Sequence, residues 1–542
     1  MTDSYLLPDL ISLSAQRYPE NTALVHGKGT MSYAALNAAV SGFASGVLNL
    51  GLRRGERIAI YLEKRFETVI ASFGAPAAGG VFVPLNPLLK PEQVAYIMRD
   101  CNVRILVTSP ERHALLRETL SSCDDLRHVV LVNHEQNHEQ NHEQTGASEE
   151  RFPLIGWNQL LQMPSRTAHT AHRVIDTDMT AILYTSGSTG KPKGVVLSHR
   201  NMVAGAKSVA SYLENTAEDA LLAALPLSFD AGFSQLTTAF HAGAKVVLLN
   251  YLLPRDVLKA LERERVTGLT AVPPLYIQLA QLDWPAGITE HLRYFANTGG
   301  RMPRETLAAL RTRVPKTKPF LMYGLTEAFR STFLPPSEVD KRPDSIGKAI
   351  PNAEILVLRE DGSPCAPDEP GELVHRGALV GMGYWNDSEK TAERYKPLPA
   401  NTPGREPGLV LPELAVFSGD TVRMDEEGFL YFIGRRDEMM KTSGYRVSPT
   451  EVEEILYATK MVGECVAFGV DHETLGQAIQ VIATPPQGGE LDIQALLAEC
   501  RNRMPAYMVP HGIDVRNGPL PRNPNGKIDR KTLSTEWVEN KA

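Results

Sequence analysis

The sequence predicts an α/β protein in which a large N-terminal domain of layered α/β subdomains precedes a small C-terminal α+β domain. The chain has 542 residues, which is too long for a single hydrophobic core. Helical and strand patterns alternate over its first part, as in layers built around mostly parallel strands. The patterns restart after Gly434-Arg-Arg-Asp437. We therefore expect one domain at 1–436 and a second, of the size of a small α+β domain, at 437–542.

The N-terminal elements follow the spacing of the apolar residues. Residues 33–50 repeat small and apolar side chains at helical intervals, and residues 57–62 read as a buried strand. Residues 93–100 are expected to form a short helix before a strand at 103–107. Residues 68–89 carry no charge, but the glycines and prolines in this run favour buried elements joined by loops over a membrane span.

The C-terminal elements are expected in the order helix, strand, strand, helix. Residues 449–457 have a helical pattern, and apolar residues around Val466 and Ile479 read as strands. A last helix is expected at 493–503. This order, after the long α/β part, supports a separate small domain.

Composition excludes several classes of function. The 56 basic and 63 acidic residues give a net charge of −7 and form no long block of one sign, which argues against a nucleic-acid partner. The five cysteines are scattered without a Cys-x-x-Cys pair, so neither a disulfide framework nor a zinc site is expected. The amino terminus lacks the pattern of a signal peptide. We expect a cytoplasmic protein without a membrane partner.

A polar insertion interrupts the first domain at residues 133–144, where Asn-His-Glu-Gln occurs three times in tandem. His134, His138 and His142 would share one face of a helix and could then bind a metal. A solvated surface loop is the simpler interpretation of such a repeat. We assign it no function.

The strongest local signal for chemistry is the segment Tyr184-Thr-Ser-Gly-Ser-Thr-Gly-Lys-Pro-Lys-Gly-Val195. An apolar strand leads into a glycine-containing loop, whose backbone amides, hydroxyls and lysines suit a phosphate group. The spacing of its glycines is not that of a Walker A loop. The candidate phosphate-binding residues are Thr185, Ser186, Gly187, Ser188, Thr189, Gly190, Lys191 and Lys193.

This loop resembles the signature of the adenylate-forming superfamily, which includes acyl-CoA synthetases, luciferases and the adenylation domains of peptide synthetases. Six further matches follow in the family's order and extend over nearly the whole chain. They are Leu225-Pro-Leu-Ser-Phe-Asp230, Tyr323-Gly-Leu-Thr-Glu327, Gly371-Glu-Leu373 with Gly383-Tyr-Trp-Asn386, Ser418-Gly-Asp420, Gly434-Arg-Arg-Asp437 and Asn523-Pro-Asn-Gly-Lys-Ile-Asp529. The resemblance implies an acetyl-CoA synthetase-like fold and ATP and Mg²⁺ as cofactors.

The resemblance also implies which residues bind the nucleoside. Tyr323, followed by Gly324, is expected to stack on adenine through its flat ring. Asp420 is expected to accept hydrogen bonds from the two ribose hydroxyls, and Arg435 to contact the same ribose. On spacing alone, Asp420 and Arg435 would be read as surface charges.

The residues expected to take part in adenylation are three. Thr326 and Glu327 match positions near the α-phosphate, and Glu327 is the candidate Mg²⁺ ligand, since this cation prefers oxygen donors. Lys527 matches the lysine that bridges the substrate carboxylate and the α-phosphate, where a cation offsets the repulsion between two anions. Without the motif, Lys527 would be one lysine among many near the end of the chain.

The second half-reaction is expected to use the same pocket after a rotation of the small domain. Asp437 matches the family's hinge position, at which a few residues absorb a large backbone change. Lys441 and Gly444 belong to the loop that the rotated domain would present to the incoming thiol.

The acid substrate is indicated less directly. Phe229-Asp230 resembles the members that activate amino acids, in which the aspartate pairs with the α-ammonium group. Alternatively, Asp230 bonds only to backbone amides of its own loop. The other pocket positions carried over from these members are mostly small and do not suggest a long alkyl chain: Ala231, Ser234, Ala271, Asn297, Gly299, Met322, Arg330 and Ser331.

The predicted function is ATP-dependent adenylation of an amino acid or small polar carboxylic acid, followed by transfer to a phosphopantetheine thiol. The segment at 323–332 resembles stand-alone prolyl-type carrier-protein ligases and exosortase-associated AMP-forming acyl-CoA ligases. Fifteen residues follow Lys527, so the acceptor is expected to be coenzyme A or a separate carrier protein, the carrier slightly favoured. A homodimer is compatible with the resemblance.

Three alternatives stay open at this point. One is a general acyl-CoA synthetase for short or medium chains. Another is an oxidative, luciferase-like enzyme that shares the adenylation step. The last is a nucleotide-binding protein without catalytic activity, which the intact candidate residues argue against.

Overall fold

The computed structural model describes residues 3–133, 151–165, 173–185, 192–400, 402, 405, 408, 411–436, 438–442, 445–472, 475–524 and 526–541. The chain forms two compact units. Unit 1 consists of Met1–Tyr251, Thr326–Phe329 and Ala378–Glu393, and unit 2 of Leu252–Leu325, Arg330–Gly377 and Arg394–Ala542. Each unit is described by itself below.

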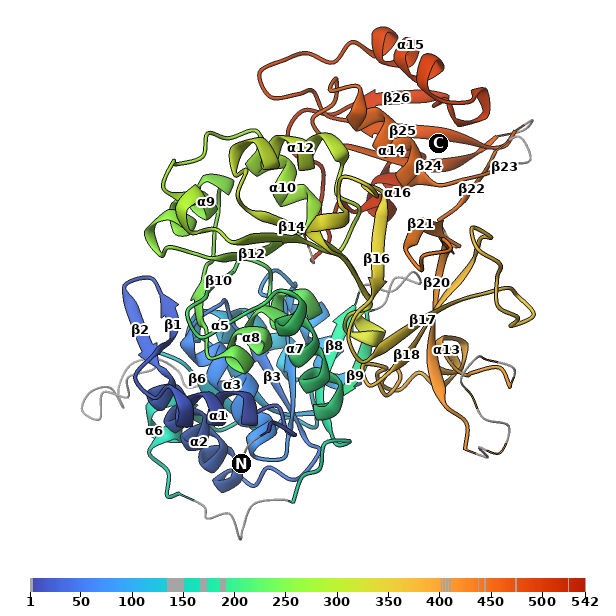
Figure 1. Ribbon diagram of the computed structural model, residues 1–542. Coiled ribbons are helices and arrows are strands. Elements are labelled where there is room, and N and C mark those ends of the chain that lie inside the picture. Colours follow the sequence, from blue (N-terminus) through green and yellow to red (C-terminus); the bar gives the residue numbers. More distant parts are fainter. Residues whose placement is uncertain are drawn as a thin grey trace. The chain divides into compact units, whose positions relative to one another are not determined.

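Unit 1 is built around two sheets (Figure 1). The larger one has the strand order β7 (Leu154–Gly156), β6 (His128–Leu131), β5 (Val103–Thr108), β3 (Arg57–Tyr61), β4 (Val81–Pro84), β8 (Met179–Thr185), β9 (Lys193–Ser198). Its strands are parallel up to β8, which forms an antiparallel hairpin with β9. The second sheet contains β2 (Gly29–Ser32), β1 (Thr22–His26), β11 (Lys245–Leu248) and β10 (Ala220–Ala223).

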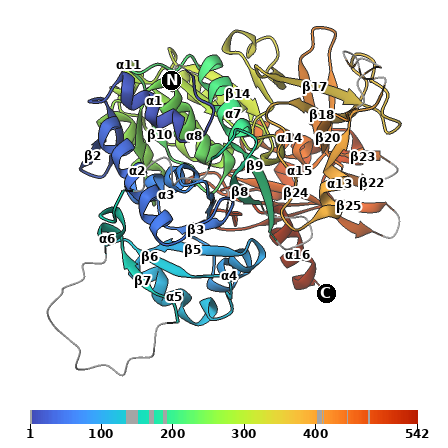
Figure 2. The ribbon, with the colours of Figure 1, turned by 90° about the horizontal axis from the view of Figure 1, so that it is seen from below.

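Helices cover both faces of the larger sheet, as parallel strands require. Figure 2 shows α4 (Pro91–Asp100) and α5 (Pro110–Leu120) on one side, and α2 (Tyr33–Asn49) and α3 (Phe66–Ala77) on the other. The other helices of unit 1 are α1 (Asp9–Arg17), α6 (Trp157–Leu161), α7 (His199–Tyr212), α8 (Asp230–Ala242) and the 3₁₀ turn η1 (Thr326–Ala328); α13 (Ser388–Arg394) begins in it. The helices and strands predicted in this part of the chain are confirmed.

Most of the uncharged run at 68–89 is buried, as expected, whereas Leu88 near its end is 81% exposed. The run lies in α3 and β4, where Phe73 and Phe82 each stack on Phe233 of α8, with ring centroids 5.6 and 4.7 Å apart. Among the described residues, no helix combines the length and the apolar character that crossing a bilayer would need. All five cysteines are free thiols.

The first part of unit 2 is a mixed sheet. Its strand order is β12 (Gly268–Ala271), β13 (Tyr294–Asn297), β14 (Lys318–Tyr323), β15 (Thr332–Leu334), β16 (Ser345–Ala349), β21 (Leu430–Arg435), β20 (Leu414–Met424), β18 (Gly371–Gly377), β17 (Ala353–Leu358). The strands from β12 to β14 are parallel, and β19 (Tyr395–Pro397) pairs with β20. The helices of this part are α9 (Pro254–Arg263), α10 (Pro273–Ala280), α11 (Ile288–His291), α12 (Arg304–Arg313) and the 3₁₀ turn η2 (Pro336–Glu338).

The C-terminal lobe, residues 438–541, has its own sheet and core within unit 2. The sheet order is β23 (Tyr445–Val447), β22 (Met440–Thr442), β25 (Gly476–Ala483), β24 (Cys465–His472), and β26 (Gly512–Val515) pairs with β25. Its helices are α14 (Pro449–Ala458), α15 (Ile493–Arg503), α16 (Arg530–Lys541) and the 3₁₀ turn η3 (Ala506–Met508). Val452, Leu456 and Leu496 pack into one buried cluster with both central strands. The elements predicted here are confirmed, except that the helix at 493–503 is not the last one. The mostly polar helix α16 follows it and buries Leu533.

The fold is therefore α/β with a large N-terminal and a small C-terminal domain. The boundary predicted between residues 436 and 437 stays a prediction, since the compact units divide the chain differently.

Candidate active site

In unit 1, the two ends of the predicted phosphate loop are joined by the β8–β9 hairpin. Thr185 pairs with Lys193, and Tyr184 with Gly194. Antiparallel pairing of this kind places the intervening loop at the end of the hairpin. The loop residues themselves, Ser186, Gly187, Ser188, Thr189, Gly190 and Lys191, lie outside the described residues.

The outer edge of β9 is covered by the segment 381–385. The Val196 amide donates to the Gly383 carbonyl at 2.9 Å, and the Trp385 amide donates to the Gly194 carbonyl at 2.7 Å. This pairing places the ring of Tyr384 next to the hairpin, with its centroid 5.5 Å from Lys193 Nζ. The Tyr384 hydroxyl donates a 2.6 Å hydrogen bond to Glu327 Oε1. Two predicted residues from distant parts of the chain, Lys193 and Glu327, thus contact the same tyrosine.

The turn that carries Thr326 and Glu327 is held in place on both sides. The Gly381 amide donates to the Glu327 carbonyl at 2.8 Å. Phe329 has a φ of 57°, a conformation that bulky residues rarely adopt, and its buried ring fills the space next to Gly205 in α7. A Cβ on Gly205 would lie 2.4 Å from that ring, so α7 needs a glycine there. The turn is fixed by packing, and its acidic side chain stays part-exposed.

The donor set at Glu327 suits Mg²⁺. This cation usually takes one or two carboxylates and completes its shell with waters and substrate phosphates. Glu327 supplies a carboxylate, and the neighbouring Thr326 supplies a hydroxyl. Within the described residues, no group of three or more His, Cys, Asp or Glu side chains forms a metal cage. The carboxylate and the hydroxyl fit a Mg²⁺ ion that would arrive with the nucleotide.

Asp230 lies at the first position of α8, where a carboxylate interacts favourably with the helix dipole. It is 3% exposed, and Phe229, Ala231 and Ser234 around it are also buried. Gly232 is required by the fold, because a Cβ at this position would lie 1.8 Å from the Pro226 carbonyl oxygen. The Leu225–Asp230 loop therefore lies tightly against the first turn of its own helix.

A residue that the motif analysis did not single out supports this loop. Lys64 donates from Nζ to the carbonyl oxygens of Ala224 at 3.0 Å and Leu225 at 3.4 Å. Burial lowers the pKa of this amine to about 8. The amine thus contacts two carbonyl oxygens at the start of the candidate acid-binding loop, although burial disfavours its charged form. No sequence motif marks this contact.

In unit 2, the carboxyl ends of neighbouring parallel strands gather the predicted pocket residues. Ala271 ends β12 and is in register with Asn297 at the end of β13, and Met322 lies near the end of β14. Ligands of open α/β sheets commonly bind at such strand ends. Asn297 is 2% exposed and donates from Nδ2 to the Gly300 carbonyl at 2.8 Å. Gly299 follows with a φ of +76°, which favours glycine.

Lys527 reaches this same edge. A Cβ built on Gly299 would lie 3.0 Å from Lys527 Cε and 3.7 Å from its Nζ. The loop that carries the lysine is closed by two contacts with Asn523. The Asn523 amide donates to the Lys527 carbonyl at 2.8 Å, and the Lys527 amide donates to Asn523 Oδ1 at 3.1 Å. Arg522 binds Glu464 at the base of the loop.

The predicted nucleoside residues of unit 2 form a second cluster, which we call the ribose cluster: Tyr323, Asp420 and Arg435. Asp420 and Arg435 are directly paired in the β20–β21 hairpin. The Tyr323 hydroxyl donates to Asp420 Oδ2, and Arg435 Nε lies 3.3 Å from Asp420 Oδ1. Burial raises the pKa of the Asp420 carboxyl, although Arg435 and Tyr323 oppose the shift. Gly324 lies next to Arg330, whose Cα would be 3.3 Å from a Cβ there.

The remaining pocket candidates are buried. Arg330 is 2% exposed and does not face solvent. Ser331 is fully buried, with its hydroxyl 2.9 Å from His375 Nδ1. Burial lowers the pKa of His375 to about 3, so its ring is neutral near pH 7. The predicted hinge Asp437 and the predicted thiol-loop residue Gly444 lie outside the described residues, and of Lys441 only the backbone, in β22, is described.

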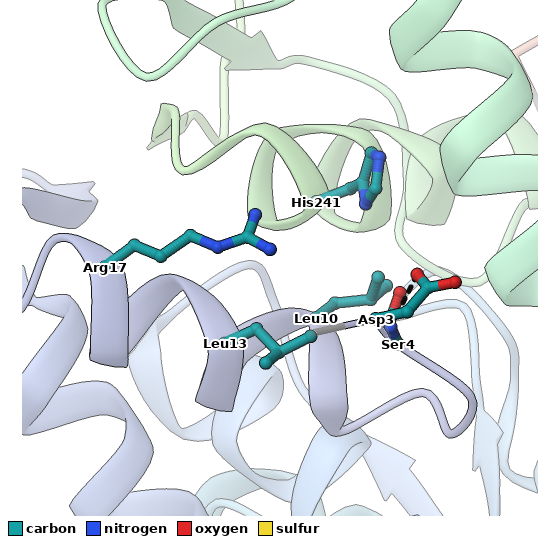
Figure 3. A pocket seen from close by; sticks show the side chains of 6 residues that line it. All are labelled: Asp3, Ser4, Leu10, Leu13, Arg17 and His241. Atoms are coloured by element: carbon teal, nitrogen blue, oxygen red, sulfur yellow. Dashed lines mark hydrogen bonds between the residues drawn. The ribbon is translucent and has the colours of Figure 1, made fainter. Parts of the chain in front are cut away.

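A separate hollow in unit 1 contains none of these residues. Figure 3 shows it between α1 and α8, lined by Asp3, Ser4, Leu10, Leu13, Arg17 and His241. The carboxylate in it, Asp3, is already paired with Lys207 at 2.6 Å. It offers no arrangement for phosphate or acid chemistry.

The functional contacts that sequence reasoning missed are those of Tyr384 and Lys64. Tyr384 stands inside the quoted Gly383-Tyr-Trp-Asn386 match, so a signal for it was present. Its role depends on pairing between β9 and residues 381–385, which are far apart in sequence.

Comparison with known proteins agrees with the motifs. Residues 11–385 match the model of the AMP-binding enzyme family, and residues 451–527 match the AMP-binding enzyme C-terminal domain. The chain is 29% identical to the long-chain-fatty-acid–CoA ligase of Salmonella typhimurium over 568 aligned positions, covering 99% of this chain and 96% of that one.

Solved structures resemble it over almost the full length. One is an anthranilate CoA ligase in complex with anthranoyl-AMP, with a TM-score of 0.85, 23% identity and coverage of 99% and 98% of the two chains. Another is the o-succinylbenzoate CoA synthetase of Bacillus subtilis with its acyl-adenylate intermediate, with a TM-score of 0.79, 25% identity and coverage of 97% and 98%. The chain belongs to the AMP-binding enzyme family and is an AMP-forming ligase.

Proposed function

We propose that the protein joins a carboxylic acid to the thiol of coenzyme A in two steps. In the first, a carboxylate oxygen of the acid attacks the α-phosphorus of ATP, the bond to the β-phosphate oxygen breaks, and pyrophosphate leaves. In the second, the thiol loses its proton to solvent and its sulfur attacks the acyl carbon. The bond from that carbon to AMP breaks, and AMP leaves with its electron pair. The approach of Lys527 to Gly299, which follows the end of β13 at Asn297, carries this proposal.

Lys527 acts in the first step. Its ammonium group is held over the strand ends by the closed 523–527 loop, where the acid and the α-phosphate would approach each other. Both are anions, so a fixed cation stabilises the transition state more than the separated reactants. On the nucleoside side, Asp420 binds the ribose hydroxyls, with Arg435 beside it and Tyr323 against the adenine.

Glu327 and the β8–β9 hairpin handle the phosphates. Thr185, Lys193 and the loop between them bind the polyphosphate, and Thr326 lies beside Glu327 to contact the α-phosphate. Tyr384 orients the Glu327 carboxylate through its 2.6 Å hydrogen bond. Glu327 would hold Mg²⁺, which would supply positive charge against the phosphates of ATP.

The acid is an amino acid or another small acid with a polar group. Asp230 supports this assignment, because a carboxylate that is 3% exposed is costly unless charge or hydrogen bonds compensate it. The start of α8 offers partial compensation, and a substrate ammonium would add an opposite charge. Ala231, Ser234 and Ala271 leave room for a small side chain.

A second candidate is a simple acyl substrate. The 29% identity to a long-chain-fatty-acid–CoA ligase over nearly the whole chain favours it. In that case Asp230 is satisfied by the amides of its own helix and has no contact with the substrate.

Pyrophosphate release across a panel of acids separates the two candidates. The panel holds the common amino acids, small aromatic and hydroxy acids, and acids from acetate to decanoate, each with ATP and Mg²⁺. We expect the highest kcat/KM for pyrophosphate release with an amino acid. Asp230→Asn should reduce the kcat/KM for that amino acid at least about tenfold and change the kcat/KM for acetate little. A preference for alkyl chains that Asp230→Asn leaves unchanged would establish the simple acyl substrate.

The acceptor and the cellular setting follow as finer proposals. Coenzyme A is the acceptor, and a phosphopantetheine carrier protein is tested beside it in the same thioester assay. Asp437 is the hinge between domains 1–436 and 437–542, and Lys441 and Gly444 approach the thiol after rotation. We place the enzyme in the cytoplasm. We also propose that it is a homodimer, and light scattering of the purified chain tests this oligomeric state.

A further inference from the structure

We propose that Arg301, Arg304, Asp344 and Glu454, which we call the clamp, hold the C-terminal lobe in the position where Lys527 meets Gly299. These four are positioning residues, and they set how the enzyme divides its time between adenylation and thioester formation. The inference rests on the proposed two-step function and adds the residues that control it.

The base of the clamp is Asp344, in the segment before β16. Its Oδ1 accepts hydrogen bonds from Arg301 Nη2 at 2.7 Å and from Arg304 Nε at 2.8 Å. Arg304 Nη2 binds the other oxygen. Burial by itself raises the pKa of the Asp344 carboxyl, but the two guanidinium groups outweigh it and hold the pKa below its ordinary value. Asp344 is therefore charged, and both arginines are fixed relative to the sheet.

The moving side of the clamp is Glu454, on α14 of the C-terminal lobe. One carboxylate oxygen accepts a 3.2 Å hydrogen bond from the Arg304 backbone amide, which lies at the start of α12. The other lies 3.7 Å from Arg301 Nε. An outer pair, Lys460 with Glu305 at 2.8 Å, joins the turn that follows α14 to α12. Glu454 thus contacts the main chain and the charged side chain of one short segment, 301–304.

The clamp and the lysine contact use the same two pieces of the molecule. Gly299, against which Lys527 lies, precedes Arg301 by two residues. On the lobe, Glu453 next to Glu454 accepts hydrogen bonds from Arg530 Nη2 at 2.9 Å and from the Ala467 amide at 2.9 Å. Arg530 follows Lys527 by three residues. Movement of α14 away from α12 would therefore carry the Lys527 loop with it.

The exposure of the clamp suits contacts that form and break in every cycle. The side chains of Arg301 and Glu454, which would separate when the lobe moves, are 28% and 14% exposed, so both are within reach of water. Ion pairs of this kind are weak and are screened by salt. A weak clamp shifts the population of the adenylation position without preventing the lobe from leaving it.

The test compares the two half-reactions in the full chain. Acid-dependent exchange of labelled pyrophosphate into ATP reports adenylation, and thioester formation from supplied acyl-adenylate and coenzyme A reports the second step. Glu454→Gln should lower exchange about fivefold, since it weakens contacts of partly exposed charges, and should leave the second step unchanged or faster. Exchange by the wild type should fall with salt, and exchange by Glu454→Gln should fall less.

The matched control is Asp340→Asn. Asp340 pairs with Arg311 of α12 at 2.6 Å. The substitution therefore removes an exposed ion pair of the same helix, and this ion pair does not reach the lobe. Asp340→Asn should change neither half-reaction. Equal loss in both half-reactions by Glu454→Gln, or no loss in either, would overturn the clamp.

A readout independent of activity separates failure of the clamp from failure of the proposed function. Amide hydrogen exchange of residues 299–304 and of α14 should speed up in Glu454→Gln relative to Asp340→Asn. No difference in these amides overturns the clamp whatever the reaction is. Faster amide exchange in Glu454→Gln, together with a wild type that catalyses pyrophosphate exchange with none of the acids tested, would keep the clamp and refute the proposed function.

Discussion

Two clusters in unit 2 each place an aspartate beside arginine, yet the pKa values of the two aspartates move in opposite directions. In the ribose cluster, burial raises the pKa of Asp420, and Arg435 only limits the shift. In the clamp, Arg304 and Arg301 outweigh burial, and the pKa of Asp344 falls. The Asp420 side chain is 11% exposed and that of Asp344 is 35% exposed.

The difference shows how burial decides what a charge does. A buried carboxylate with one nearby guanidinium is at an energetic disadvantage, which a ligand with hydroxyl donors can relieve. A part-exposed carboxylate with two guanidinium partners is satisfied by the protein itself. The first arrangement suits binding, and the second suits holding two segments together. The predictions below test this contrast, beginning with the largest effect.

Replacing Asp420 should remove activity without removing stability. Asp420→Asn loses the charged acceptor for the ribose but also loses the buried charge, so adenylation should fall about 100-fold while the free energy of unfolding stays the same or rises. Pyrophosphate exchange and urea unfolding measure the two quantities. Asp425→Asn is the control, because Asp425 accepts the Phe429 amide at 2.8 Å in the same hairpin; it should lose stability and keep activity. Parallel losses of both quantities in Asp420→Asn would contradict the contrast.

Replacing Gly299 should have two effects that can be measured separately, strain in the backbone and displacement of Lys527. Gly299→Ala adds a Cβ that is 3.0 Å from Lys527 Cε, at a φ of +76°. The backbone strain should cost about 1–2 kcal/mol of stability, and the displaced lysine should slow adenylation about tenfold. Gly428→Ala is matched, since Gly428 has a φ of +83° with nothing within 4 Å of its Cβ position. Gly428→Ala should lose a similar free energy of unfolding and keep its activity. If both variants lose the same activity, the contact with Lys527 is not the cause.

The two aspartates should respond to acid with opposite signs. The pKa of Asp344 is lowered on folding, so its contribution to stability is present above the ordinary pKa and is lost as the pH falls through the lowered value. The pKa of Asp420 is raised, so its unfavourable contribution appears as the pH rises through the raised value and is absent at lower pH.

Urea unfolding from pH 3 to 7 measures this directly. The stability difference between wild type and Asp344→Asn should shrink as the pH falls. As the pH falls over the same range, the wild type should gain stability relative to Asp420→Asn. If both stability differences change in the same direction with pH, burial does not distinguish the ribose cluster from the clamp. These are the smallest effects, each a fraction of the total stability.

Much of the fold could be predicted because its signals are local. Alternation of periodicities predicted α2, β3, β5 and α14, and the glycines and prolines of residues 68–89 predicted the separate buried elements that α3 and β4 form there. Arg330 shows where local signals end. An arginine is usually exposed, and only the packing of unit 2 decides that this one is 2% exposed.

The sequence by itself indicated the residues proposed for the chemistry: the phosphate loop between Thr185 and Lys193, the acidic residue Glu327, Asp420 and Arg435, and a lysine near the end of the chain. These depend on residue type and short spacing, which local motifs record. The tertiary structure alone decided that Tyr384 holds Glu327, that Lys527 meets Gly299, and that Glu454 reaches the 301–304 segment. Such contacts join residues from 57 to more than 200 positions apart, and strand register and lobe packing, which no short pattern encodes, bring them together.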